Sequence, residues 1–191
     1  NKKYITINKI SGSSVGTFCG FCYLDNNLEL YEKIYCQSRN SIIKDLNLKV
    51  CGNLLKSYID SKDADFYKKF NNKIYINFYD INKKQDVVTS KFKDNNDLYM
   101  KIRFSTFLPL VFDGFITFNN KIDALIPHVF YNEKNVLFFN LTTLKKLFYC
   151  MNVSEKNNVF KIMHGIIDMH QFFTTRGKTE LCSFVNEWTS Y

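Results

Sequence analysis

Residues 10–20 read ISGSSVGTFCG, and this stretch decides how the rest of the chain is interpreted. It follows residues 4–10, whose apolar and polar side chains alternate as they do in a β-strand. After it, the small and apolar residues 15–24 predict a buried helix. Residues 12–16, GSSVG, therefore fit the pattern G-x-S-x-G between a predicted strand and a predicted helix.

That pattern is typical of a nucleophile elbow, in which Gly12 and Gly16 would let strand and helix pass closely. Ser14 would present its hydroxyl at the N-terminus of the helix. There the helix dipole and the backbone N–H of Val15 would stabilise the oxyanion of an acyl tetrahedral intermediate. The alternative is a plain Gly/Ser turn in which Ser13 or Ser14 caps the helix.

Composition limits the class of protein. With 191 residues, 46% of them hydrophobic, the chain is long enough for a sizeable core and is not a disordered protein. The net charge of +8 favours anionic partners such as acidic lipid headgroups or nucleic acid. The lysines are spread in small pairs such as Lys68-Lys69 and form no basic arm. A solvated Lys-rich surface is therefore the plainer interpretation, and nucleic acid is not an expected partner.

The six cysteines show no disulfide-framework spacing. The pair Cys19 and Cys22 falls inside the predicted helix and alone does not make a four-ligand zinc site, so we expect no metal and no cofactor. A reducing location follows, in the cytoplasm or at the membrane periphery, although glycosylation sequons at Asn140 and Asn152 argue for secretion. The sequence contains no run of 18 apolar residues and therefore predicts no membrane span.

Further helices and strands alternate along the chain, which predicts an α/β layered domain. The expected helices are residues 28–38, 64–70, 96–104, a segment capped by Thr142 or Thr143 that runs through Phe148, and 159–173 with Gly177 as its stop; the expected strands are 73–79, 86–92 and 136–140, with a turn at Asn119-Asn120.

Residues 9–24, KISGSSVGTFCGFCYL, resemble the elbow segment of patatin-like phospholipases, an isoleucine or valine followed by G-T-S-A-G and a small-residue helix. A second match is MKIRFSTFLPLVF at 100–112, followed by KIDALIP at 121–127. In that family a helix ends in a Ser-containing segment with a nearby Pro, and a later strand carries the catalytic aspartate. The helix around residues 164–173 also resembles the family's late helix, more loosely. Ser105, Phe107, Pro109 and Asp123 occupy the matching positions.

The resemblance implies a single patatin-like domain over residues 1–191, with three layers, a mainly parallel central sheet and helices on both faces. It implies a lipid acyl-ester hydrolase, a phospholipase A or a lipase, with a Ser–Asp dyad and no catalytic histidine. Ser14 would be the nucleophile and Asp123 the base. The substrates would be phospholipid or neutral-lipid acyl esters, with docking on an anionic membrane surface.

The chain also departs from the family pattern. The glycine-rich oxyanion loop before the elbow is absent, so we expect an N-terminally incomplete form. Residues 123–125 read DAL where the family has D-G-G, and residues 126–128 read IPH where it has Asn-Asn-Pro. Asp113-Gly114 offers a nearby D-G pair, which we interpret as a turn. Two alternatives stay open: an inactive relative that binds lipid or protein, and a triad esterase in which Ser14 works with His128 or His170.

Overall fold

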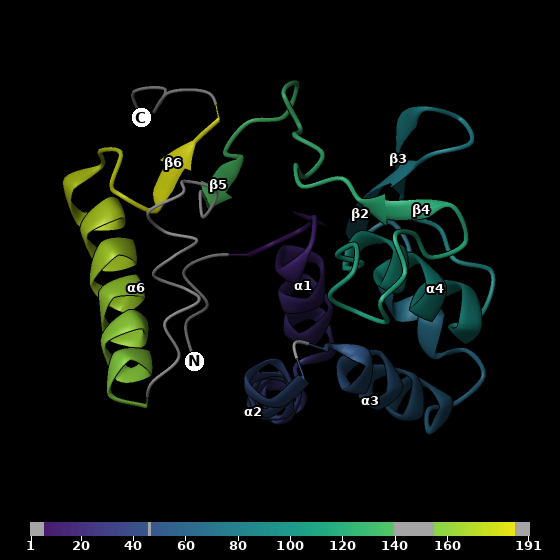
Figure 1. Ribbon diagram of the computed structural model, residues 1–191. Coiled ribbons are helices and arrows are strands. Elements are labelled where there is room, and N and C mark those ends of the chain that lie inside the picture. Colours follow the sequence, from purple (N-terminus) through teal and green to yellow (C-terminus); the bar gives the residue numbers. More distant parts are fainter. Residues whose placement is uncertain (1–5, 46, 140–154, 186–191) are drawn as a thin grey trace. The chain divides into compact units, whose positions relative to one another are not determined.

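The computed structural model describes residues 6–45, 47–139 and 155–185, and the chain divides into two compact units, Asn1–His128 and Val129–Tyr191. Helices and strands mix along the chain, so its class is α/β, as the sequence predicts (Figure 1). The elbow and the candidate aspartate both belong to the first unit.

The first unit carries most of the regular structure. In chain order its elements are β1 (Ile10–Gly12), α1 (Val15–Asp25), α2 (Leu28–Asp45), α3 (Lys49–Asp60), the 3₁₀ helix η1 (Phe66–Phe70), β2 (Ile74–Asp80), β3 (Gln85–Thr89), α4 (Asn95–Ser105) and β4 (Lys121–Asp123).

Most predicted elements of this unit are confirmed, with shifted bounds. The helix expected at 15–24 is α1, and the one expected at 96–104 is α4. The helix expected at 28–38 continues to Asp45 as α2, while residues 66–70 form a 3₁₀ helix. The strands expected at 73–79 and 86–92 are β2 and β3, although β3 ends at Thr89.

The strand expected at 4–10 is wrong over residues 6–9, which form no strand; residues 1–5 lie outside the described part. The strand is instead Ile10–Gly12, which pairs with residues 74–76 of β2. Alternation of side chains predicted an extended segment, but the position of β2 decides where pairing begins.

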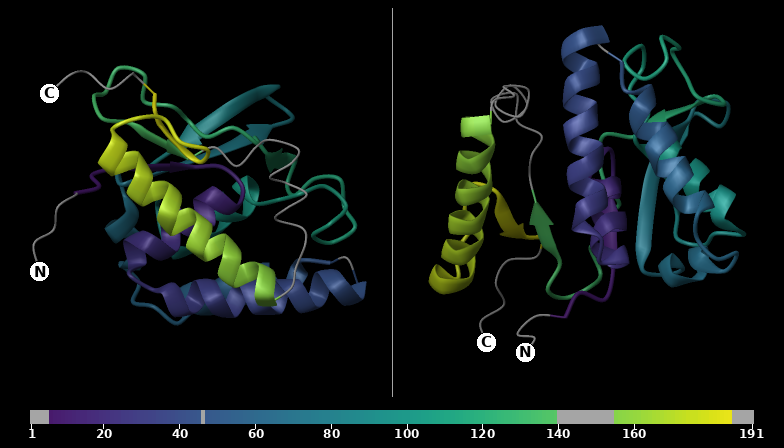
Figure 2. Two further views of the ribbon diagram at one scale, coloured as in Figure 1. Left: turned by 90° about the vertical axis from the view of Figure 1, so that its left-hand side faces the viewer. Right: turned by 90° about the horizontal axis from the view of Figure 1, so that it is seen from below.

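Helix α3 was not predicted. Gly52 lies inside it, and glycine is a weak helix former. Its buried residues Leu55 and Ile59 are spaced four apart, which is the signal that identifies it. The glycine has a packing role, because a Cβ at this position would lie 2.9 Å from Nε of Arg103 in α4. Figure 2 shows α2 and α3 side by side, and the two helices are in contact.

Strand β2 is the centre of a four-stranded sheet. It pairs in parallel with β1, and antiparallel with both β3 and β4. Among the described strands the sheet is therefore mixed, and the expectation of a mainly parallel sheet is wrong there. Parallel pairs need a long crossover, and α1 to η1 supply one between β1 and β2, whereas short connections join β2 to β3.

Strands β1 and β4 share one edge of β2. A strand residue has one pairing partner on each edge. Both β3 and β4 pair with residues 78–80 of β2, so these two strands lie on opposite edges of β2. Both β1 and β3 pair with Ile76, so β1 also lies opposite β3, on the same edge as β4. The two strands approach each other from opposite directions. Gly12 ends β1 opposite Ile76, and Asp123 ends β4 opposite Phe78. Only Asn77 separates the two ends along β2.

The hairpin turn at Asn119-Asn120 sets the position of β4. Both asparagines have positive φ, 51° and 57°, as a two-residue type I′ turn requires. Phe118 and Lys121 each donate the backbone N–H to the other's carbonyl, at 3.0 Å in both directions. The turn predicted from the sequence is thus confirmed.

The core of this unit lies against one face of β2. Ile74, Ile76 and Phe78 alternate along the strand and are almost completely buried. They join a cluster with Phe21 of α1 and Ile102 of α4. Burying a side chain of this size contributes about 2 kcal/mol relative to leaving it exposed. The packing fixes α1, and with it the elbow, relative to the sheet.

The second unit contains α6 (Glu155–Thr175) and an antiparallel pair, β5 (Leu137–Phe139) and β6 (Cys182–Phe184). The helix expected at 159–173 is confirmed as part of α6, and the strand expected at 136–140 is confirmed over residues 137–139. Asn140 lies outside the described residues. Gly177 is not the stop, because Arg176 takes the left-handed conformation that ends α6, with φ 53°. The helix expected near Thr142 and Phe148 lies outside the described residues.

Candidate active site

The ends of β1 and β4 bring the two predicted catalytic segments together. The hydroxyl of Ser13, the first residue after β1, donates a hydrogen bond of 2.8 Å to Oδ1 of Asp123, the last residue of β4. The partners are 110 residues apart in the chain, and both are buried. The serine that contacts the aspartate is thus Ser13, the neighbour of the predicted nucleophile.

Ser14 lies on the turn between β1 and α1 in a strained conformation. Its φ is 55° and its ψ is −132°, a region that a residue with a side chain rarely adopts. Its hydroxyl makes no capping hydrogen bond to α1, and the residue is half-buried. The simple interpretation, a serine N-cap, therefore does not apply to Ser14. A serine on a strained strand-to-helix turn is the geometry of a nucleophile elbow.

The two motif glycines differ in what surrounds them. A Cβ on Gly12 would lie 2.5 Å from the backbone nitrogen of Thr17 and 2.6 Å from the carbonyl carbon of Gly16. Gly12 is therefore required for the close approach of β1 to the first turn of α1. A Cβ on Gly16 would meet nothing within 4 Å. The close approach predicted for both glycines holds for the first only.

The end of α4 holds the elbow from the other side. Ser105 accepts a hydrogen bond at its carbonyl from the N–H of Ser14, at 3.0 Å. Its hydroxyl also shares a hydrogen bond of 2.8 Å with the hydroxyl of Thr17, and both side chains are fully buried. The Ser-containing segment noted in the sequence is thus in contact with the turn that carries Ser14.

The amide of Val15 is the expected oxyanion donor. The neighbouring N–H groups are engaged, that of Gly16 by the carbonyl of Ser13 and that of Thr17 by the carbonyl of Ser14. Within the described residues no acceptor is found for the N–H of Val15, which begins α1. An N–H at a helix N-terminus carries the positive end of the helix dipole and suits a developing negative charge.

Asp123 has two unequal carboxylate oxygens. Oδ1 accepts from the Ser13 hydroxyl and from the backbone N–H of Leu125, the latter at 3.0 Å. Oδ2 is buried and has no hydrogen-bond partner among the described residues. Leu125 adopts φ 64°, a conformation that favours glycine. The backbone shape that a D-G-G motif supports is therefore present here with leucine at the third position.

Asp113, the other aspartate followed by glycine, has a structural role. Its carboxylate accepts from Nη2 of Arg103 at 2.8 Å, and Gly114 has φ 76° in the turn that follows. The interpretation of Asp113-Gly114 as a turn is confirmed. Because its charge is paired with a buried guanidinium, Asp113 is not available as a base for Ser14.

Asn77 is a site residue that the sequence reasoning missed. It lies on β2 between the positions that pair with Gly12 and Asp123. The side chain is buried, and its Nδ2 donates 2.6 Å to the carbonyl of Ile126. This bond holds the segment after Asp123 against β2. A lone amide inside the apolar strand 73–79 was the signal that could have identified it.

His128 belongs to the first unit, and His164 and His170 belong to the second. His128 stacks on Tyr75 of β2, with ring centroids 6.1 Å apart. His164 lies 3.5 Å from Glu180 in the second unit, to which His170 also belongs. Among the described residues, the hydrogen bonds to the Asp123 carboxylate come from Ser13 and Leu125.

The cysteine pair lies inside α1, as predicted. Cys22 is buried, and burial, followed by the nearby Cys19 and Asp25, raises its pKa to about 12. A thiol that stays protonated is a poor nucleophile and metal ligand. Over the part of the chain that the structure describes, no group of three His, Cys, Asp or Glu side chains is arranged to hold a metal ion. Nor does any helix in that part have the length and apolar character needed to cross a membrane.

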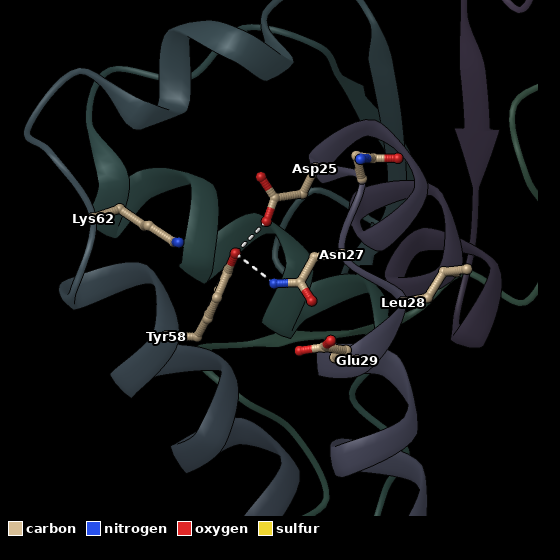
Figure 3. A pocket seen from close by; sticks show the side chains of 7 residues that line it. Asp25, Asn27, Leu28, Glu29, Tyr58 and Lys62 are labelled. Atoms are coloured by element: carbon tan, nitrogen blue, oxygen red, sulfur yellow. Dashed lines mark hydrogen bonds between the residues drawn. The ribbon is translucent and has the colours of Figure 1, made fainter. Parts of the chain in front are cut away.

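A pocket of about 570 Å³ lies at the C-terminal end of α1 (Figure 3). It is lined by Asp25, Asn26, Asn27, Leu28, Glu29, Tyr58 and Lys62. The Tyr58 hydroxyl donates to Asp25 and accepts 2.8 Å from Nδ2 of Asn27, so these polar groups satisfy one another. Because neither Ser14 nor Asp123 lines it, this pocket has no part in the candidate active site.

The Ser14 turn, the Asp123 carboxylate and the N–H of Val15 lie at one edge of the sheet. A hydroxyl, a carboxylate and a helix N-terminal N–H are the kinds of group that acyl transfer uses. No protein-family model, curated protein or solved structure matches the chain. The chemical interpretation of the site therefore rests on its own geometry.

Proposed function

We propose that the chain is a lipid acyl-ester hydrolase that uses Ser14 as nucleophile and Asp123 as base. One observation carries the proposal: two segments 110 residues apart meet at the strained serine turn, through the 2.8 Å bond from Ser13 to Asp123. Strain of this kind is retained where the surrounding structure enforces it, and it is concentrated at functional sites. A patatin-like three-layer arrangement belongs to the same proposal.

In the acylation step Ser14 Oγ attacks the carbonyl carbon of the ester, and its proton goes to Asp123. The N–H of Val15 stabilises the oxyanion of the tetrahedral intermediate. When this intermediate collapses, the bond to the leaving alcohol breaks, and the alcohol takes the proton from Asp123. Ser14 is left acylated.

In the deacylation step water attacks the acyl-serine carbonyl, and Asp123 takes a proton from the water. Collapse of the second intermediate breaks the bond to Ser14 Oγ, which recovers its proton from Asp123. The products are a carboxylic acid and an alcohol, and the serine and carboxylate return to their starting states.

Exposed apolar side chains next to the site favour an acyl ester of lipid type. Val15 follows the nucleophile and is 59% exposed, while Leu125 and Ile126 follow the base and are 66% and 65% exposed. Apolar side chains held at the surface beside a reactive group suit an alkyl chain. Phospholipid or neutral lipid at an anionic membrane surface is the proposed substrate source, in line with the net charge of +8.

A fluorophosphonate ester probe tests the proposal directly. Ser14 displaces fluoride from phosphorus, and the adduct is detected by intact mass. We expect wild type to label, Ser14→Ala to lose labelling, and Asp123→Asn to label at least about 100-fold more slowly, the usual contribution of a general base.

Two further results contradict the proposal. Folded wild type that does not label would favour the inactive relative that binds lipid or protein. Loss of labelling in His128→Ala or His170→Ala would favour the triad esterase, since a Ser–Asp dyad needs neither histidine.

A further inference from the structure

Ser13 occupies a position that the proposed mechanism does not use. The residue is 8% exposed, so its hydroxyl is poorly placed to attack a substrate. Its hydroxyl is nevertheless directed at the proposed base, at 2.8 Å from Asp123 Oδ1. The neighbouring Ser14 is more exposed and carries the strained backbone. The two serines of the GSSVG turn therefore differ in surroundings and in the contacts they make.

The two oxygens of the Asp123 carboxylate differ in their contacts, because one accepts hydrogen bonds and the other has no donor among the described residues. Oδ1 accepts two hydrogen bonds, one from the Ser13 hydroxyl, 110 residues earlier in the chain, and one from the N–H of Leu125, two residues later. Two donors on one oxygen hold the plane of the carboxylate in place. Oδ2 is the buried oxygen for which the described residues supply no partner. A buried carboxylate oxygen without a donor is unusual and calls for an explanation.

We propose that Ser13 is a positioning residue for the dyad. With the Leu125 N–H it fixes Oδ1, so that Oδ2 is the oxygen that takes the proton from Ser14. Ser13 itself forms no bond to the substrate. The inference rests on the proposed function, because it assigns a partner to the base of that same site.

The sheet edge explains why Ser13 can have this role. Gly12 ends β1 opposite Ile76 of β2, and Asp123 ends β4 opposite Phe78. The residue after β1 is therefore the first whose side chain can meet the end of β4. Ser14, one residue further, has already turned into the start of α1. A hydroxyl at position 13 joins the two strand ends, while position 14 presents the nucleophile.

The experiment compares labelling kinetics by the fluorophosphonate probe in wild type, Ser13→Ala and Ser13→Thr. Ser11→Ala is the matched control, because it is the same substitution two residues earlier, in β1, at a hydroxyl that makes no hydrogen bond to Asp123. The first-order labelling rate and the reversible affinity of the probe are measured separately, and fragmentation of the labelled peptide identifies the modified serine.

We expect Ser13→Ala to lower the first-order rate about 100-fold, with little change in probe affinity, since misplacing a catalytic group costs about that much. Ser13→Thr, which keeps a hydroxyl, is expected to recover most of the rate. Ser11→Ala is expected to label as wild type does. The adduct is expected on Ser14.

Other outcomes overturn the inference in distinguishable ways. If Ser13→Ala labels at the wild-type rate, the positioning role is wrong and the proposed function stands. If the adduct lies on Ser13, the roles of the two serines are exchanged. If folded wild type does not label, the proposed function itself fails. Should Ser13→Ala not fold, Ser13→Cys replaces it; a full wild-type rate from this weaker donor then contradicts the role of the hydrogen bond.

Discussion

The residues of the elbow differ in backbone strain and in the space available for a side chain. Ser14 adopts a strained φ and ψ, while Gly12 is enclosed by the backbone of the next turn and Gly16 faces open space. The pattern G-x-S-x-G treats its two glycines alike, but only Gly12 lies where a Cβ would collide. At the residue scale the motif is thus held by one steric requirement and one strained residue.

Gly12→Ala is expected to lower the free energy of unfolding by about 2–4 kcal/mol, because a Cβ 2.5 Å from the Thr17 nitrogen forces the backbone to move. Gly16→Ala is the matched control within the same motif. It is expected to be neutral or to stabilise by up to about 1 kcal/mol, since alanine favours the helix. Denaturant unfolding followed by circular dichroism measures both. Equal losses for the two variants would contradict the difference in packing.

At the element scale, a buried ion pair connects α4 to the segment before β4. Arg103 is 4% exposed, and its Nη2 donates 2.8 Å to Asp113 Oδ2. The guanidinium lies 4.2 Å from the ring centroid of Phe112 and also close to the rings of Phe107 and Phe118. The pair therefore holds in place the connection that leads to Asp123.

Asp113→Asn is expected to destabilise the protein by about 3–5 kcal/mol, because it leaves the Arg103 charge buried and unpaired. Asp60→Asn removes the partner of Lys56 in an exposed pair on α3 and is the control, with an expected cost below about 0.5 kcal/mol. Both changes are measured by denaturant unfolding. A small effect of Asp113→Asn would show that the ion pair does not stabilise the connection.

At the scale of the whole molecule, each unit contains a buried carboxylate that favours its charged form. The pKa of Asp80 in the first unit is lowered: burial raises it, but the N–H groups of Lys83 and Asn82 and the charge of Lys121 outweigh that effect. The pKa of Asp168 in the second unit is lowered in the same way. Burial is outweighed there by hydrogen bonds that include one from the Thr179 hydroxyl. Both units should therefore respond to acid.

The direction of the pH dependence follows from the linkage between protonation and folding. A carboxyl group whose pKa is lower in the folded than in the unfolded state stabilises the protein above the unfolded value, about 3.9 for aspartate. This stability is lost as the pH falls through the folded value. We expect the free energy of unfolding of wild type to decline below about pH 4 and to decline less steeply in Asp168→Asn. Asp65→Asn, at an exposed pair with Lys68, serves as control. Unfolding curves at pH 7, 4 and 3 measure the difference, and identical slopes in wild type and Asp168→Asn would contradict it.

The local structure around the candidate site follows from short-range sequence signals. The residues of the elbow, α1, α4 and the Asn119-Asn120 turn follow from side-chain periodicity and from glycine and asparagine preferences, which act over a few neighbouring residues. The α/β class follows from the alternation of these elements. Asp123 was singled out by its resemblance to a family pattern, and the structure places it beside the elbow.

Which residues meet at the candidate site depends on the tertiary structure. The start of β1 at Ile10, the antiparallel pairings of β2, and the meeting of the β1 and β4 ends depend on strand register, which is set between segments far apart in the chain. For the same reason the contact of Asp123 with Ser13, and the place of Asn77 between the two strand ends, could not be predicted. A periodic pattern specifies which face of an element is buried, but not the partner against which it is buried.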